Sequence, residues 1–242
     1  PDYADPYTNL GVAFHQKGDR TSAIKNYQRA IQIKPDNAEA HSNLGNVLKE
    51  EGNLGAAIES CNRALNINPS LAEAHSNLGA VLLETGDLAR AIKSCNRAIE
   101  INPEFAEAHC NLGNALQENG DPRAAIESYN RTLKIKPNFT MARSQRLRQQ
   151  AFICDWGAIK KDRNLIPALG VSTEFVTPFT MLYLEDHPAR HLKRSTLFAQ
   201  TKCEEKSATS AAIAHPVEKT KRLKIGYFSG DFHSHPVTRL IV

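Results

Sequence analysis

The sequence predicts a mostly α-helical fold of stacked helix pairs, and three observations carry this prediction. A 34-residue unit recurs without insertion over residues 4–37, 38–71, 72–105 and 106–139. A glycine divides each unit, and glycine ends a helix well because it adopts left-handed dihedral angles without strain. A proline closes each unit, since it lacks the N–H that would continue a helix. The glycines are Gly18, Gly52, Gly86 and Gly120, and the prolines are Pro35, Pro69, Pro103 and Pro137.

Small residues inside the expected helices indicate close packing. Glycine recurs in the middle of each first helix, where it costs about 1 kcal/mol relative to alanine, so we expect the second helix to approach there. Leucine precedes each of these glycines and is expected to fill the seam between helices. The pairs are Leu10-Gly11, Leu44-Gly45, Leu78-Gly79 and Leu112-Gly113. The repeated histidines His41, His75 and His109 are expected to pack, because residues one repeat apart cannot share a metal ion.

Composition narrows the class of protein. Of 242 residues, 41% are hydrophobic and 23% charged, as in ordinary globular proteins. No run of 18 apolar residues occurs, so no membrane partner is expected. The five cysteines form no CxxC pair, which argues against disulfides or zinc and favours a reducing, cytoplasmic location. Cys61 and Cys95 replace Tyr27 and Tyr129 of the other repeats and are expected to be small buried fillers. A chain that begins with proline is expected to be a fragment.

Charge divides the chain into two parts. Residues 1–140 carry 14 basic and 17 acidic side chains, whereas residues 141–242 carry 16 basic and 9 acidic ones. The basic part either favours an anionic ligand such as a nucleotide diphosphate or is an ordinary solvated surface. No Lys/Arg block with interleaved aromatic residues is present, so nucleic acid is not an expected partner.

The spacing of Leu-Gly, Gly, Ala and Pro resembles the tetratricopeptide repeat over residues 4–139. The resemblance implies a right-handed α-α superhelix whose first helices line a concave groove. Asparagines recur on one face of these helices, at Asn9, Asn43, Asn46, Asn77, Asn111 and Asn114. Their amides either hold the backbone of an acceptor protein or extended peptide, or cap and cross-link neighbouring helices. Four successive copies favour the peptide groove.

Residues 140–220 are expected to cap the array and to connect it to residues 221–242. Residues 140–151 suit a degenerate capping helix. Asp155 is expected to cap a helix continuing to about Leu169, with Trp156 packed under it. Another helix is expected over residues 187–206, while the segment 177–183 suits either helix or strand. Residues 207–220 are small and polar and predict a linker.

The last residues predict the start of an α/β domain over residues 221–242. Residues 223–229 suit a strand, and Pro236 suits the first turn of a following helix. The segment RLKIGYFSGDFHSHPVTRLIV resembles the start of the catalytic region of the O-linked N-acetylglucosamine transferases. The segments Ile153–Trp156 and Met181–Tyr183 are also similar to that family's connecting region.

This resemblance implies that the chain is the amino-terminal part of a protein O-glycosyltransferase. The family transfers N-acetylglucosamine from UDP-GlcNAc to Ser or Thr hydroxyls without a metal or other cofactor, in a GT-B-like fold of two Rossmann-like lobes. The resemblance places His235 at the catalytic site. It also implies that most of the catalytic region is missing from this sequence, so the chain is expected to be inactive by itself. The sequence leaves two alternatives: the sugar donor could instead be another nucleotide sugar such as GDP-fucose, and His235 could instead cap a helix. The alternative to a transferase is a non-catalytic scaffold for protein–protein interaction.

Overall fold

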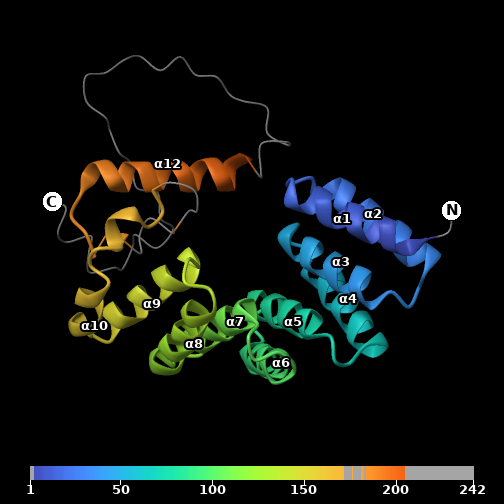
Figure 1. Ribbon diagram of the computed structural model, residues 1–242, viewed down its shortest axis with the longest axis horizontal. Helices are drawn as coiled ribbons and strands as arrows, with labels where there is room; N and C mark the ends of the chain where they lie inside the picture. The colour runs from blue at the N-terminus through green and yellow to red at the C-terminus, as the bar shows by residue number, and fades with distance from the viewer. Residues whose placement is uncertain (1–2, 172–175, 177–180, 183, 205–242) are drawn as a thin grey trace, which may run out of the picture. The chain divides into compact units, whose positions relative to one another are not determined.

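The computed structural model describes residues 3–171, 176, 181–182 and 184–204, all within one compact unit, Pro1–Glu204 (Figure 1). Four helix pairs follow the predicted repeats. They are α1 (Ala4–Gln16) with α2 (Arg20–Ile33), α3 (Ala38–Glu50) with α4 (Leu54–Ile67), α5 (Ala72–Glu84) with α6 (Leu88–Ile101), and α7 (Ala106–Glu118) with α8 (Pro122–Ile135). Then come α9 (Thr140–Phe152), α10 (Trp156–Lys161), the 3-10 helix η1 (Ile166–Ala168) and α12 (Pro188–Glu204).

The turn inside each pair is built from one glycine and one capping residue. Gly18, Gly52, Gly86 and Gly120 have φ angles of +80°, +77°, +81° and +81°, as predicted for left-handed residues. The next residue caps the second helix: the Asp19 carboxylate accepts a hydrogen bond from the Ser22 N–H at 2.9 Å. Asn53, Asp87 and Asp121 accept equivalent bonds. Each cap satisfies a backbone N–H that the helix itself leaves unbonded.

The mid-helix glycines are sites of close helix contact, as predicted. A Cβ atom placed on Gly45 would lie 2.6 Å from Cys61 Sγ, and one on Gly79 would lie 2.5 Å from Cys95 Sγ. The ring of Tyr27 or Tyr129 occupies the same space at Gly11 and Gly113. Cys61 and Cys95 are fully buried, which confirms them as fillers.

Each second helix packs against its own first helix and against the first helix of the next repeat. Leu44 thus packs with Ala23 and Tyr27 of the preceding repeat, and Leu78 is equally buried. The prediction that all four leucines fill the seam is wrong at Leu10, which is 46% exposed. Since α1 is the first described helix, no second helix lies before it to cover Leu10.

A fifth unit continues the 34-residue register in its backbone. Helix α9 has 13 residues, like α1, α3, α5 and α7. Cys154 stands 34 positions after Gly120 and takes the same left-handed conformation, with φ +59°. Asp155 caps α10 by accepting a hydrogen bond from the Ala158 N–H at 3.0 Å, which confirms the predicted cap. The capping helix predicted from residue 140 is therefore the first half of a further repeat.

The second half of this unit departs from the repeat. Leu147 and Ile159 stand 34 positions after Gly113 and Ala125, so two larger buried side chains replace the small residues found at the helix contact of the regular repeats. Helix α10 ends at Lys161, and the prediction that it continues to about Leu169 is wrong. The prediction that Trp156 packs under it is also wrong, because Trp156 is 53% exposed.

A separate core connects α9 and α10 with residues that follow them. Leu147, Ile159, Ile166, Leu169, Val176 and Met181 form it. Arg194 of α12 is 0% exposed beside this core. Its Nε donates to the carbonyl oxygen of Leu169 at 2.8 Å and its Nη2 to that of Ile166 at 2.9 Å. Its Nη1 lies 2.8 Å from Glu185 Oε2, so the buried charge is paired.

The expected strand at 223–229, the linker at 207–220 and His235 lie outside the described residues. Residues 3–171, 176, 181–182 and 184–204 contain helices and turns but no strand. The helix expected over 187–206 is present as α12. Within the described segments, no helix combines the length and apolar character needed to cross a membrane.

Candidate functional site

The first helices α3, α5 and α7 enclose a hollow of about 340 Å³ that contains four of the six predicted groove asparagines. We call this hollow the asparagine groove. Its lining is Asn43, Asn46, Lys49, Glu73, Ser76, Asn77, Ala80, Phe105, Glu107, Cys110, Asn111, Phe139 and Met141. Residues 34 apart line one hollow because they occupy equivalent positions on neighbouring first helices, which contact each other.

Two of these asparagines cross-link neighbouring repeats. Asn77 Nδ2 donates to Ser42 Oγ at 3.1 Å and to the Ser42 carbonyl oxygen at 3.2 Å. Asn111 Nδ2 makes the same pair of bonds to Ser76, at 3.1 and 3.4 Å. The NH₂ groups of Asn77 and Asn111 therefore cross-link neighbouring helices, which was the alternative to peptide binding. Their Oδ1 atoms accept no hydrogen bond from any described residue and are available to a ligand N–H.

The other four asparagines differ from one another. Asn43 and Asn46 are half-buried, line the groove, and form no side-chain hydrogen bond within the described part of the chain. Asn114 instead accepts a hydrogen bond from the Tyr129 hydroxyl at 2.8 Å, so its carbonyl oxygen is used inside its own repeat. Asn9 is exposed on α1 and does not line this hollow. Asn43 and Asn46 are thus the asparagines with unused donors and acceptors in the groove.

The apolar and charged residues of the groove were not among the site residues predicted from the sequence. Phe105 and Phe139 each occupy the N-cap position of a first helix, α7 and α9, and their rings give the hollow an apolar wall. Glu73, Glu107 and Lys49 supply charge along it. The 34-residue spacing of the two phenylalanines could have predicted this wall, because equivalent positions on stacked repeats lie on the same surface.

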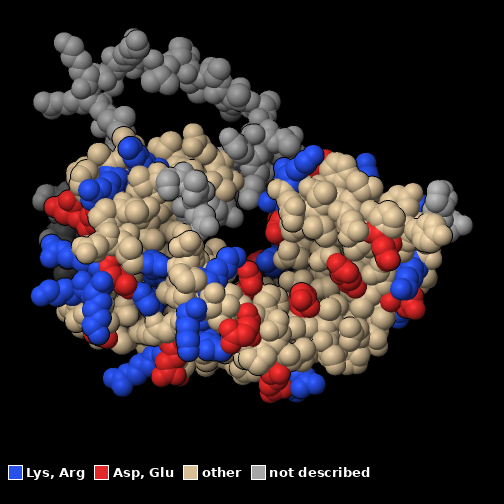
Figure 2. Space-filling model, viewed as in Figure 1, with Lys and Arg blue, Asp and Glu red and all other residues tan. Residues whose placement is uncertain are grey.

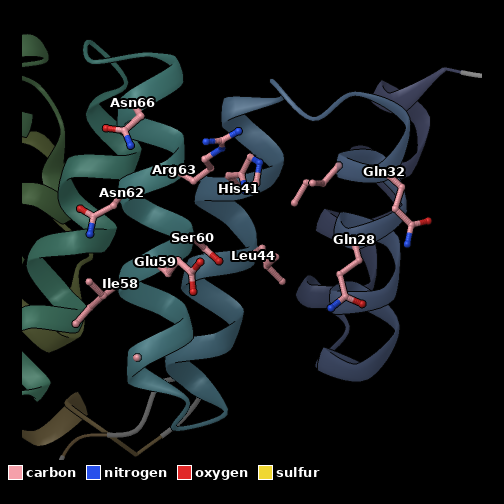
Figure 3. A pocket seen from close by; sticks show the side chains of 12 residues that line it. Gln28, Gln32, His41, Leu44, Ile58, Glu59, Ser60, Asn62, Arg63 and Asn66 are labelled. Carbon is pink, nitrogen blue, oxygen red and sulfur yellow. The ribbon is translucent and has the colours of Figure 1, made fainter.

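A second, larger hollow of about 1000 Å³ lies between α2 and α4 (Figure 3). Gln28 and Gln32 face it from α2, and Glu59 and Arg63 from α4, with Leu44 of α3 between them. Both charge signs and several amides are present, so the lining selects no class of ligand by charge.

The repeated histidines are structural, as predicted. His41, His75 and His109 each place Nε2 3.0–3.1 Å from the carbonyl oxygen of the proline six residues earlier. Arg143, 34 positions after His109, donates to the carbonyl oxygen of Pro137 in the same way. Burial lowers the pKa of His41 despite this bond. Across the described ranges no group of three or more metal-ligating side chains could hold an ion.

Comparison with known proteins supports the repeat assignment. Residues 14–52, 45–86 and 80–120 match the TPR repeat model, and residues 106–139 match the tetratricopeptide repeat model. No curated protein matches the sequence.

Solved structures give two kinds of similarity. MamA is 23% identical, with a TM-score of 0.51 over 88% of this chain and 98% of its own. PilF of Pseudomonas aeruginosa is 19% identical, with a TM-score of 0.65 over 83% of this chain and 91% of its own. Both show the fold alone. A mutant O-GlcNAc transferase of Thermobaculum terrenum is 32% identical, with a TM-score of 0.52 over 54% of this chain.

The similarity to the transferase is partial, since it spans 26% of the length of that enzyme. The two repeat models, in contrast, together cover residues 14–139 without a gap, and the helix pairs follow the same boundaries. The chain belongs to the tetratricopeptide repeat family.

Proposed function

We propose that this chain binds extended segments of partner proteins in the asparagine groove, as the amino-terminal part of a protein O-glycosyltransferase. The observation that carries the proposal is the row of half-buried amides from α3, α5 and α7 in one hollow. An amide offers two donors and one acceptor, so a row of amides can bond the backbone of a peptide without reading its side chains.

Some of the asparagine amides hold the repeats together, and others are free to bind a peptide. The cross-links from Asn77 and Asn111 hold adjacent first helices in register and leave their carbonyl oxygens for peptide N–H groups. Asn43 and Asn46 have both halves of the amide free for a peptide. The walls formed by Phe105 and Phe139 offer apolar contact beside this polar row.

The transferase part of the proposal rests on sequence resemblance and on the 32% identity to an O-GlcNAc transferase. The donor would be UDP-GlcNAc and the acceptors Ser or Thr hydroxyls of proteins held by the groove. His235 would act at the catalytic site, where a histidine suits proton transfer near neutral pH.

The second candidate is a scaffold that binds partner proteins without chemistry of its own. It is supported by the tetratricopeptide repeats themselves, which match over residues 14–139, because stacked repeats of this kind offer extended binding surfaces without any catalytic group. Both candidates use the same groove and differ only in whether transfer occurs.

Peptide binding is tested with the pair Asn43→Ala and Asn46→Ala, because neither side chain bonds to the described repeats. We expect the double variant to bind an arrayed library of extended peptides about tenfold more weakly, since each lost hydrogen bond contributes roughly 0.5–1.5 kcal/mol. Its melting temperature should stay unchanged. The control is Asn96→Ala on α6, an exposed amide outside the groove. Equal affinity of the double variant and the wild type would remove the groove proposal.

Transfer is tested separately with the natural full-length protein and labelled UDP-GlcNAc. We expect incorporation of label into Ser or Thr of bound proteins, and at least a hundredfold loss in His235→Ala with folding intact. Peptide binding without any incorporation would leave the scaffold as the function.

A further inference from the structure

A hollow of about 530 Å³ lies where the turn between α7 and α8 meets the junction of α9 and α10. We call it the junction pocket. Its lining is Gln117, Glu118, Gly120, Pro122, Arg148, Gln149, Ala151, Phe152 and Trp156. It lies at the boundary between the regular repeats and the fifth unit and shares no lining residue with the asparagine groove.

Two aromatic side chains in this pocket are mostly exposed. Phe152 is 75% exposed and Trp156 is 53% exposed. The residues one repeat earlier are Glu118 and Pro122, so the aromatic pair is particular to the fifth unit. Exposed aromatic residues beside arginine are the residue types that dominate binding energy at protein interfaces.

Two polar side chains of the pocket, Gln149 and Arg148, have no partner within the described residues. The amide of Gln149 forms no hydrogen bond with any described residue, and its polar atoms are not fully buried, so they can bond to a ligand. Arg148 is exposed and has no ion-pair partner among the residues that the structure describes. Its neighbours differ, since Arg146 pairs with Asp162 and Arg143 bonds to a backbone carbonyl. Glu118, on the opposite wall, accepts a hydrogen bond from Gln117 Nε2 at 3.1 Å.

The pocket lining itself has one cation, Arg148, and one anion, Glu118, but the fifth unit as a whole is positively charged. Its residues 140–171 carry six basic and two acidic side chains, whereas residues 4–139 carry 14 basic and 16 acidic ones. Figure 2 shows Lys and Arg gathered over this end of the repeats, with Asp and Glu more frequent over the earlier helices. An acidic partner is therefore attracted here rather than to the preceding repeats.

We propose that the junction pocket binds an acidic segment of a partner protein through one apolar anchor. The anchor side chain inserts between Phe152 and Trp156. A carboxylate next to the anchor pairs with Arg148 in a charge-assisted hydrogen bond. The amide of Gln149 bonds to the backbone of the segment and so gains the partner that it lacks in the free chain.

Trp156 makes this proposal testable, because it is the only tryptophan of the chain. In the full chain its emission should resemble that of tryptophan in water and be quenched by iodide. The probes are capped peptides with a central Leu, Phe or Tyr flanked either by Asp or by Lys. We expect at least one Asp-flanked peptide to shift the emission to shorter wavelength and protect it from iodide, and the Lys-flanked peptides to have no effect.

Matched variants assign the contacts. Arg148→Glu should weaken binding of the Asp-flanked peptide at least tenfold, as should Phe152→Ala, each with an unchanged melting temperature. Arg63→Glu is the control, since Arg63 is also exposed and unpaired within the described residues but lies on α4. The Asn43→Ala and Asn46→Ala pair should bind the peptide normally, which separates this site from the asparagine groove.

Three results would overturn the proposal. One is emission from the free chain that iodide does not quench, because the pocket would then already be filled. Another is equal binding of Asp- and Lys-flanked peptides, which would exclude the role of Arg148. The last is the absence of any fluorescence change across the whole panel at millimolar peptide.

Discussion

The regular repeats and the fifth unit share one backbone register but use it differently. In residues 4–139 a glycine in each first helix admits a full second helix, with Cys or Tyr filling the contact. In the fifth unit Leu147 occupies the glycine position and Cys154 the left-handed turn position. The fifth unit thus lacks the small-residue contact of the regular repeats, and its second helix, α10, has six residues where α8 has 14.

The two regions also handle charge differently. Between the first two repeats, His15 Nε2 and Arg20 Nε each lie 3.0 Å from Glu50 Oε2, near the surface. In the segment that follows the fifth unit, Arg194 of α12 and Glu185 form an ion pair that is almost fully buried. A buried pair is more sensitive to loss of one member, because the remaining charge is left in a low-dielectric environment.

The largest expected effect comes from breaking the buried pair. Glu185→Gln should destabilise the region from α9 to α12 by about 3–5 kcal/mol, because Arg194 would remain buried without a counter-ion. Urea denaturation followed by circular dichroism should then show α9–α12 unfolding before the regular repeats. The control Glu100→Gln removes an exposed pair with Arg97 and should cost less than about 1 kcal/mol. Equal effects of the two variants would contradict the distinction.

The same pair predicts a response to acid. Burial raises the pKa of Glu185, but the hydrogen bonds and charges of Arg194 and Arg190 outweigh it and leave the pKa lowered. A lowered folded-state pKa contributes stability that is present above the unfolded value and lost as pH falls through the folded one. The region from α9 to α12 should therefore lose stability on acidification, and Glu185→Gln should lose this dependence.

The glycine contact is tested with Gly79→Ala. The new Cβ would lie 2.5 Å from Cys95 Sγ and 3.3 Å from the carbonyl oxygen of Ala91. Overpacking of this kind typically costs about 1–3 kcal/mol, which exceeds the gain in helix propensity of about 1 kcal/mol. Thermal denaturation of Gly79→Ala, Cys95→Ala and the double variant measures the coupling. We expect the double variant to be more stable than the sum of the two changes predicts, whereas strict additivity would argue against the contact.

A substitution at the turn of the fifth unit should increase stability, by less than Gly79→Ala is expected to decrease it. Cys154→Gly should stabilise the fifth unit by about 0.5–1 kcal/mol, because left-handed dihedrals strain every residue that has a Cβ atom. The reverse change Gly120→Cys, at the equivalent turn of the fourth repeat, should destabilise by a similar amount. Chemical denaturation of both variants checks the prediction, and a destabilising Cys154→Gly would refute it.

The smallest effect is expected at the exposed cluster around Glu50. Burial raises the pKa of its carboxyl, but hydrogen bonds from His15 and Arg20 outweigh this and lower it to about 2. Stability from this carboxylate is therefore present above the ordinary glutamate pKa of about 4.3 and lost as pH falls toward 2. Solvent screening limits it to less than about 1 kcal/mol. Glu50→Gln should flatten the acid side of the stability profile slightly, with Glu59→Gln as a control.

The repeat architecture could be predicted from the sequence alone, because the period, the glycines and the prolines act through local backbone geometry that no distant contact has to supply. The face that carries Asn43, Asn77 and Asn111 could also be predicted, since residues 34 apart must fall on equivalent surfaces of stacked units. The same reasoning correctly placed Cys61 and Cys95 in the core and Asp155 at a helix cap.

The use of each side chain, in contrast, depends on contacts between distant residues. Asn77 and Asn111 bond to Ser42 and Ser76 of the preceding repeats, whereas Asn43 stays free and Thr8, which stands at the equivalent position of the first repeat, accepts a hydrogen bond from Asn37 instead. The exposure of Trp156 and the end of α10 at Lys161 likewise appear only in the folded chain. These outcomes depend on which distant groups meet, because long-range contacts and burial are set by the whole fold rather than by any local pattern.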